Sequence, residues 1–292
     1  MKKITLIIIL LLSFLLVSCE NNKENFEIIT TSFFENDIVN NITKNKLKSK
    51  SLISPGVDLH DYRPTSKEMR EIKQSKLFIF TSYNIHHWLN NNVETLVSNN
   101  TIVINLNDYN NLNYNDLHYW TDPYLILEFI NIIKTKIIEI DPTNKEFYNT
   151  NATNYYNKIK LLISDFESFL KNNNVEIYFA GHNSMYYFEQ RFKIKINALS
   201  NTNKPDADLT SKQITDLINQ IKNNNIRYLY IEELVEPKIA KTIQRELKKN
   251  NYTLNLLLLH GYHNISKEDS KNNVTYYDLF KQNIENIKKG VN

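Results

Sequence analysis

The chain has little cysteine, glycine and proline, and no surplus of one charge. Its 292 residues include one Cys, four Gly and six Pro. One cysteine cannot form a disulfide within the chain, and the sequence contains no glycine-rich phosphate loop. Once the lysines at positions 2 and 3 are set aside with the targeting segment described next, 33 basic side chains stand against 32 acidic ones. That balance gives no electrostatic reason to expect nucleic-acid binding.

The most apolar run of the chain lies at its N-terminus. Residues 4–17 are almost wholly apolar, yet the run is shorter than the roughly 20 residues that a membrane-spanning helix needs. It ends in Leu-Val-Ser-Cys at residues 16–19, which resembles the cleavage box of bacterial lipoproteins. We expect a signal peptide at residues 1–18, a polar tether at residues 19–25, and acylation of Cys19. Several acyl chains on one residue give stable membrane anchoring; a periplasmic and a cell-surface location both stay open.

Strand and helix signals alternate at both ends of the mature chain and are purely helical in its middle. The pattern predicts an α/β fold: two lobes with parallel β-sheets flanked by helices, joined by a long helical spine. The histidines described next add the expectation of a metal site in the cleft between the lobes. We place the N-terminal lobe at residues 26–121, the helical bridge at 122–174 and the C-terminal lobe at 175–292. The predicted strands are residues 27–31, 50–54, 77–81, 101–105, 175–180, 226–231 and 254–259. The predicted helices are residues 34–42, 66–74, 123–140, 145–170, 185–192, 210–222, 237–249 and 276–288.

Four of the seven histidines are candidate metal ligands. His60, His182 and His260 each follow a predicted strand, where α/β proteins build their ligand sites, and His118 precedes the helical bridge. Two of the four fall in each lobe, which is the division that a site between lobes needs. The adjacent pair at positions 86 and 87 points in directions about 100° apart on a helix, so we interpret it as packing or surface.

Four segments carry a resemblance to a known family. They are residues 54–65 (SPGVDLHDYRPT), residues 118–123 (HYWTDP), residues 181–188 (GHNSMYYF), and the Ile-Glu-Glu of residues 231–233 with Pro237. In this order they resemble the zinc/manganese solute-binding lipoproteins of ABC importers, the cluster A-I metal-binding proteins. The resemblance covers essentially the whole mature chain. It implies a metal ion held between two lobes at His60, His118 and His182, and only modest lobe movement on release.

The fourth ligand departs from that family, in which it is usually an aspartate after the last strand of the second lobe. Here His260 stands at the corresponding place. Either His260 replaces the carboxylate, or the fourth ligand is His263, or no protein group serves. We favour His260 and expect His263 to be exposed. Asp58 and Asp122 are candidates for orienting the imidazoles, or else simply form turns.

The donor types favour zinc. Imidazoles suit zinc, copper and nickel, whereas manganese prefers oxygen ligands and binds most weakly among the divalent ions. Four protein ligands leave no open position of the kind that a catalytic zinc keeps, so we expect no enzyme. A zinc hydrolase on three histidines would need a base such as Glu232 or Glu233, which we interpret instead as the end of a strand or as partners of the ligands.

The sequence therefore predicts an extracytoplasmic, lipid-anchored zinc-binding protein that delivers the ion to an ABC permease with its ATPase. We expect a monomer that contacts the membrane through Cys19 and does not bind nucleic acid. Two alternatives remain: a binding protein of the same family for manganese or another divalent metal, and a surface adhesin on the same fold.

Overall fold

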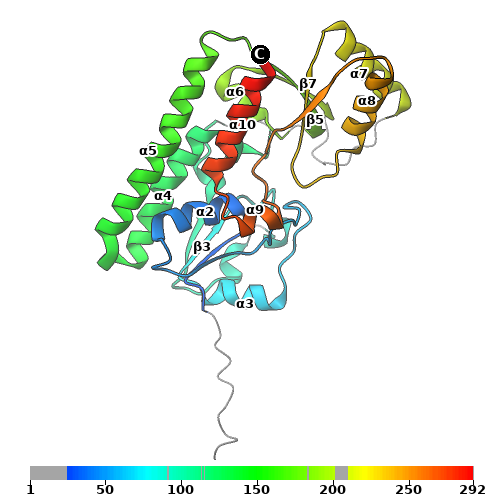
Figure 1. Cartoon of the computed structure of the whole chain (residues 1–292). Coiled ribbons are helices and arrows are strands. Elements are labelled where there is room, and N and C mark those ends of the chain that lie inside the picture. Colours follow the sequence, from blue (N-terminus) through cyan, green and yellow to red (C-terminus); the bar gives the residue numbers. More distant parts are fainter. Residues whose placement is uncertain are drawn as a thin grey trace, which may run out of the picture.

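The computed structural model describes residues 25–90, 92–112, 114, 116–182, 184–200 and 210–291. The predicted signal peptide, Cys19 and most of the tether lie outside the described residues. Two four-stranded parallel sheets form the centres of two lobes, and a pair of long helices runs alongside both (Figure 1). This is the α/β architecture that the sequence predicts. None of the helices in the described ranges has the length and apolar character required to cross a membrane.

The first lobe is built on a sheet with the strand order β2-β1-β3-β4. Its strands are β1 (Ile28–Thr30), β2 (Ser49–Ser51), β3 (Leu77–Phe80) and β4 (Ile102–Asn105), and its helices are α2 (Phe33–Thr43) and α3 (Ser66–Gln74). The predicted capping box at the start of α3 is present, since Thr65 accepts from the N–H of Glu68 while the Glu68 carboxylate accepts from the N–H of Thr65. Its sharp start ends the loop that carries His60.

The second lobe repeats this arrangement, with the strand order β6-β5-β7-β8. Its strands are β5 (Glu176–His182), β6 (Lys195–Ser200), β7 (Tyr228–Ile231) and β8 (Asn255–Leu258), and its helices are α6 (Tyr186–Phe192), α7 (Ser211–Asn223) and α8 (Lys238–Lys249). In both sheets the second strand of the lobe lies at the edge and the first lies inside it. Strand β6 was not predicted, because its residues continue directly from the end of α6 without a turn signal.

The spine consists of α4 (Pro123–Ile140) and α5 (Lys145–Leu170), which pack side by side along both lobes (Figure 1). Ile126, Phe129, Ile130, Ile133 and Ile137 of α4 are fully buried in the main hydrophobic core. This i, i+3, i+4 spacing is the apolar face of an amphipathic helix. A continuous core thus joins the spine to both lobes.

The C-terminal segment returns from the second lobe to the first. The short helix α9 (Lys267–Lys271), which was not predicted, lies beside α2, and α10 (Tyr276–Val291) then runs back along the spine (Figure 1). Five 3₁₀ turns complete the described elements: η1 (His87–Leu89), η2 (Val93–Thr95), η3 (Leu106–Tyr109), η4 (Tyr119–Thr121) and η5 (Pro142–Asn144).

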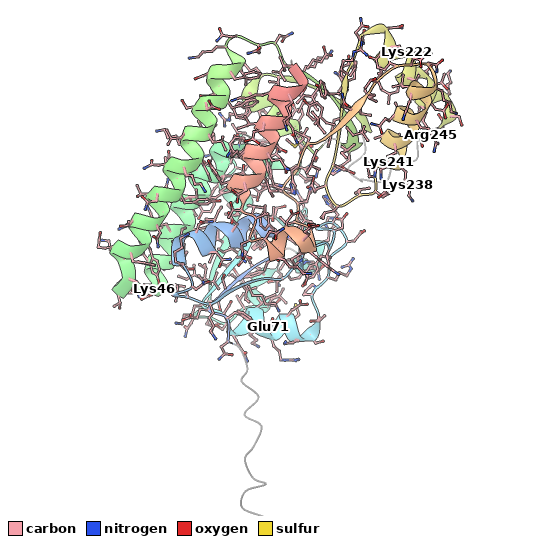
Figure 2. The ribbon with its side chains drawn as sticks, in the orientation of Figure 1. Lys46, Glu71, Lys222, Lys238, Lys241 and Arg245 are labelled. Carbon is pink, nitrogen blue, oxygen red and sulfur yellow. The ribbon has the colours of Figure 1, made fainter. Side chains whose placement is uncertain are left out.

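The outer face of the second lobe is polar. Lys222 of α7 and Lys238, Lys241 and Arg245 of α8 lie along its outer side (Figure 2). The opposite face of α8 buries Ala240, Ile243 and Leu247 in a separate small core under the sheet. The two helices therefore cover the sheet on the side away from the spine.

Candidate metal centre

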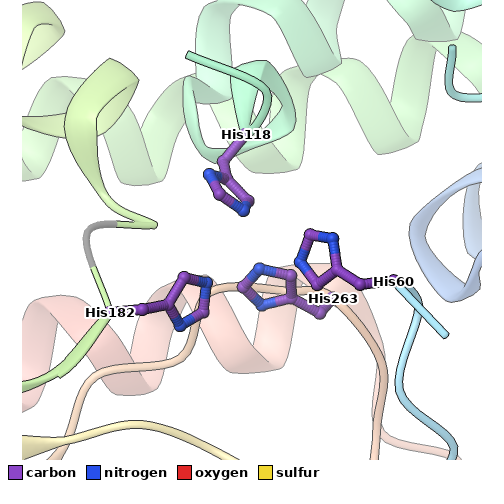
Figure 3. Close-up of side chains that lie close together, drawn as sticks. All are labelled: His60, His118, His182 and His263. Atoms are coloured by element: carbon purple, nitrogen blue, oxygen red, sulfur yellow. The ribbon is translucent and has the colours of Figure 1, made fainter. Parts of the chain in front are cut away.

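Four histidine rings meet between the two sheets. They belong to His60, His118, His182 and His263, and one ring nitrogen from each lies within 4.8 Å of the others (Figure 3). The ring centroids are separated by 5.1–6.2 Å in all six pairs. Each lobe supplies two rings, as expected for a site in an inter-lobe cleft.

Three of these rings belong to residues that the sequence singles out, and the fourth belongs to His263, the alternative, rather than to the favoured His260. His260 lies outside the cluster: its ring stacks on Tyr262, and its Nδ1 accepts the Tyr262 N–H at 2.9 Å. Asn283 binds both the N–H and the carbonyl of His260, which fixes this residue toward α10. Tyr262 has a left-handed backbone with φ of 60°, and this turn brings His263 back into the cleft.

Gly261 makes room for that turn. A Cβ atom at this position would lie 2.7 Å from the His263 ring, closer than atoms pack, so any larger residue would displace the imidazole. His263 was expected to be exposed, but its side chain is largely covered. The sequence signals available were this glycine between two histidines and the paired glutamates at the end of the neighbouring strand.

Three of the four rings are held by a carboxylate at Nδ1. Asp116 lies 3.0 Å from His118, Glu232 lies 2.7 Å from His182, and Glu233 lies 3.0 Å from His263. A carboxylate at Nδ1 holds the proton there and leaves the lone pair on Nε2. Among the described residues the Nε2 atoms of all four rings are buried and have no hydrogen-bond partner. Buried polar atoms rarely lack a hydrogen-bond partner, which indicates that these four nitrogens serve together to bind a ligand.

The two aspartates that the sequence suggested for orienting the imidazoles form a turn and a helix cap instead. Asp58 accepts the backbone N–H of His60 at 2.7 Å, in the manner of a turn-forming aspartate. Asp122 caps α4 by accepting the Tyr124 N–H, and it also pairs with Arg191 of α6 at 2.7 Å. The residue that holds His118 is Asp116, which sequence reasoning missed although it lies only two positions away.

The ionisation of the rings differs between the lobes. Burial lowers the pKa of His60 to about 3 and the pKa of His118 to about 4. Burial opposes protonation of His263 as well, but the hydrogen bond and charge of Glu233 raise the pKa of His263 above its ordinary value. Burial alone would raise the pKa of Glu233, yet His260, His263 and the Gly261 N–H hold it well below its usual range.

A small cavity of about 90 Å³ opens onto three of the four histidines, His60, His182 and His263. It is lined from the first lobe by residues 56–60 and from the second by residues 232–235, together with His182 and His263. Pockets for organic ligands usually enclose roughly 300–1,000 Å³. The cavity therefore suits an ion and a few waters rather than a larger substrate.

The other histidine pair does not join the cluster. His86 is buried and its ring packs against Trp88, while His87 is exposed. This agrees with the prediction that the pair is packing and surface.

Comparison with known proteins relates the chain to proteins that are named for metal uptake and transport. The family model described as "Zinc-uptake complex component A periplasmic" matches residues 28–290. The high-affinity zinc uptake system protein ZnuA of Bacillus subtilis is 23% identical over 93% of this chain and 89% of its own length. The manganese ABC transporter substrate-binding lipoprotein PsaA of Streptococcus anginosus is 24% identical over 100% of this chain and 99% of its own.

A solved structure shares the fold. The metal-dependent lipoprotein YcdH from Bacillus subtilis aligns with a TM-score of 0.80 at 23% identity, covering 91% of this chain and 99% of its own. At that identity the likeness concerns the two-lobed architecture, and the ligands must be argued from the residues of this chain.

Proposed function

The chain belongs to the family of periplasmic zinc-uptake component A proteins, and from this premise we propose that it captures zinc outside the cytoplasm and delivers it to an ABC permease. The ion is the cargo of the protein, and no reaction is catalysed. We propose His60, His118, His182 and His263 as its ligands. The N-terminal lobe at residues 26–121, the bridge at 122–174 and the C-terminal lobe at 175–292 are the units proposed to hold it.

One observation carries this proposal: four buried Nε2 atoms without hydrogen-bond partners converge from distant parts of the chain. Zinc prefers four ligands in a tetrahedron with metal–nitrogen distances of roughly 2.0–2.1 Å, which places the nitrogens about 3.4 Å apart. The separations here are at most 4.8 Å, so small ring movements suffice to reach that arrangement. A ring of four imidazoles also leaves no position for a catalytic water.

The choice of zinc follows from the donors. No carboxylate belongs to the cluster of four, and neutral imidazole suits zinc far better than manganese, which prefers oxygen. The manganese-binding relative keeps manganese as the second candidate. The choice of zinc depends most on His263, since a carboxylate at this position would make the site less selective for zinc over manganese.

The location is proposed from the N-terminus. The Leu-Val-Ser-Cys segment at residues 16–19 supports an acylated Cys19, and two of the compared proteins are described as lipoproteins. Labelled palmitate should enter the wild-type protein in cells and fail to enter Cys19→Ala. Incorporation into both would reject Cys19 as the anchor.

Metal analysis of the purified mature protein tests the cargo. We expect one zinc per chain after dialysis against equal concentrations of zinc and manganese, and a monomer by light scattering. Bound manganese in place of zinc would reject zinc as the cargo, and no retained metal would reject the proposed site.

A further inference from the structure

A short stretch of backbone connects the two lobes next to the histidines. We call residues 261–265 the strap: it follows β8 of the second lobe, carries His263, and reaches the first lobe. The Trp120 Nε1–H donates to the Gly261 carbonyl at 2.9 Å, and the Gly56 N–H donates to the Ile265 carbonyl at 2.8 Å. Both ends of the strap are therefore bound to the first lobe.

The strap meets the first lobe at a tight turn, residues 54–57. The Val57 N–H donates to the Ser54 carbonyl at 3.1 Å, and Gly56 has φ of +84°, a conformation that few other residues adopt. Proline followed by glycine at the two central positions is typical of a type II turn. This turn leads directly into the loop that carries His60, so its position sets the position of that ring.

Asn264 joins the strap to this turn. Its side chain is buried, and its Nδ2 donates to the carbonyls of Ser54 at 2.7 Å and Val57 at 2.9 Å. Its Oδ1 accepts the Ile265 N–H at 2.9 Å. One carboxamide thus holds both ends of the turn with its two N–H groups, from the residue next to His263.

Glu233 grips the same strap from the second lobe. Its carboxylate accepts the Gly261 N–H at 2.8 Å and contacts the His263 ring. The strap is consequently held from both sides, and Asn264 supplies two of its hydrogen bonds to the turn that leads into the loop of His60, beside the one from the Gly56 N–H to the Ile265 carbonyl.

We propose that Asn264 is a positioning residue for the metal site: it fixes His263 relative to His60 and keeps the two lobes together around the rings. This inference rests on the proposed function for its effect on metal, but the contact itself can be tested without metal. Losing partners that orient ligands typically lowers metal affinity about 10- to 100-fold. Asn264→Ala should fall in that range.

The experiment compares Asn264→Ala, Asn264→Ser and Asn264→Asp with Asn286→Ala. Asn286 is a matched control, because it is also a buried asparagine, and its side chain donates to the carbonyl of Leu258 at the end of β8, before the strap begins, and not to the turn at residues 54–57. Zinc affinity by chelator competition should fall for Asn264→Ala and remain near wild type for Asn286→Ala. Asn264→Ser keeps one donor and should recover part of the zinc affinity lost in Asn264→Ala. Asn264→Asp places a carboxylate against two carbonyls and should recover none of that affinity.

Two further readouts separate positioning from general destabilisation. At saturation with cobalt, Asn264→Ala should show a weakened visible absorption band of the tetrahedral site. A protein that is thermally destabilised but keeps an intact site would show this band at full strength. In the metal-free protein, amide exchange at Gly56 should accelerate in Asn264→Ala and stay unchanged in Asn286→Ala.

The outcomes decide between the two proposals. If the wild-type protein fails to bind zinc, the proposed function falls, while exchange at Gly56 still tests the contact. If wild type binds zinc and Asn264→Ala binds it equally well with an unchanged cobalt band, the positioning role is rejected. Equal losses of affinity in Asn264→Ala and Asn286→Ala would reject it as well.

Discussion

The two lobes share a strand order but hold their histidines by different means. In the first lobe His118 takes its carboxylate partner from Asp116, two residues earlier in the same loop. In the second lobe the partners of His182 and His263 are Glu232 and Glu233, which lie 50 and 30 residues away in sequence at the end of β7. One half of the site is therefore built by local turns, and the other half exists only once the sheet has formed.

The difference also appears in the charge of the rings. The first lobe presents His60 and His118 as neutral imidazoles with lowered pKa values, while Glu233 raises the pKa of His263. The two rings of the first lobe offer lone pairs that are already free, whereas the raised pKa of His263 means that this ring binds an ion in competition with a proton. The predictions below use this contrast, from the largest effect to the smallest.

The largest effect should follow from removing a single histidine ring, either one of the first lobe or one of the second. His118→Ala and His263→Ala should each weaken zinc binding by roughly a thousandfold or more, about 4 kcal/mol, because each leaves only three imidazoles. His260→Ala is the control and should retain most of the affinity, since that ring contacts Tyr262 rather than the cluster. Chelator competition measures all three. A large loss in His260→Ala with none in His263→Ala would return the fourth position to His260.

Zinc should stabilise the protein because it connects the lobes. At a free concentration a thousandfold above Kd, a ligand that binds only the folded state adds about 4.1 kcal/mol. With roughly 2–4 °C per kcal/mol for a chain of this size, removing zinc with a chelator should lower Tm by about 10 °C. Calorimetry with and without zinc measures the change, and the shift should vanish in His118→Ala. An unchanged Tm in the wild type would mean that zinc does not bind the folded protein.

A smaller effect should separate the two kinds of carboxylate. Glu233→Gln and Asp116→Asn should each reduce zinc affinity about 10- to 100-fold, with the greater loss in Glu233→Gln. Glu233 contacts both His263 and the Gly261 N–H, whereas Asp116 also binds its own loop and can be replaced there by an amide oxygen. Isothermal titration of both variants ranks them. The reverse order would show that the local partner matters more than the distant one.

The smallest effect is the slope of affinity against pH. Since the pKa values of His60 and His118 are about 3 and about 4, both rings stay neutral down to pH 5 and meet no proton competition there. The pKa of His263 is raised above the ordinary value of about 6.5, so competition between zinc and its proton begins above pH 6.5 and persists as the pH falls. The proton of His263 should therefore make the logarithm of the affinity fall by about one per pH unit between pH 7 and 5, rather than by the four that four free histidines would give.

Glu233→Gln should flatten that slope further, because it removes the carboxylate that favours the charged form of His263. Affinities measured in non-coordinating buffers at several pH values provide the test. A slope near four in the wild type would contradict the lowered pKa values of the first lobe.

The fold was largely predictable because its signals are local. The capping boxes at Thr65 and Thr210 and the apolar face of α4 each depend on residues within a few positions of one another. Strand β6 escaped because its pattern merges with that of α6, and α9 because a helix of five residues has too few turns to show a period.

The sequence indicated those histidines whose positions follow from the end of a strand or the start of a helix. It did not indicate the histidine whose position depends on a turn of the backbone. His60, His118 and His182 each sit at or just beyond a strand or before a helix, and they point into the cleft. The choice between His260 and His263 depends on the left-handed backbone of Tyr262 and on the grip of Asn283 on His260, which no spacing rule reveals. The role of Asn264 likewise cannot be recognised from the sequence, because its side chain contacts a turn that lies 207 residues earlier.

The convergence of four Nε2 atoms has a consequence for the ion's entry. A cation that binds all four must exchange its hydration shell for the imidazoles, so how readily the ion gives up water affects the speed of capture. Magnesium parts with its water reluctantly and demands six oxygen neighbours. Four imidazole nitrogens meet neither requirement, so we expect this site to reject magnesium.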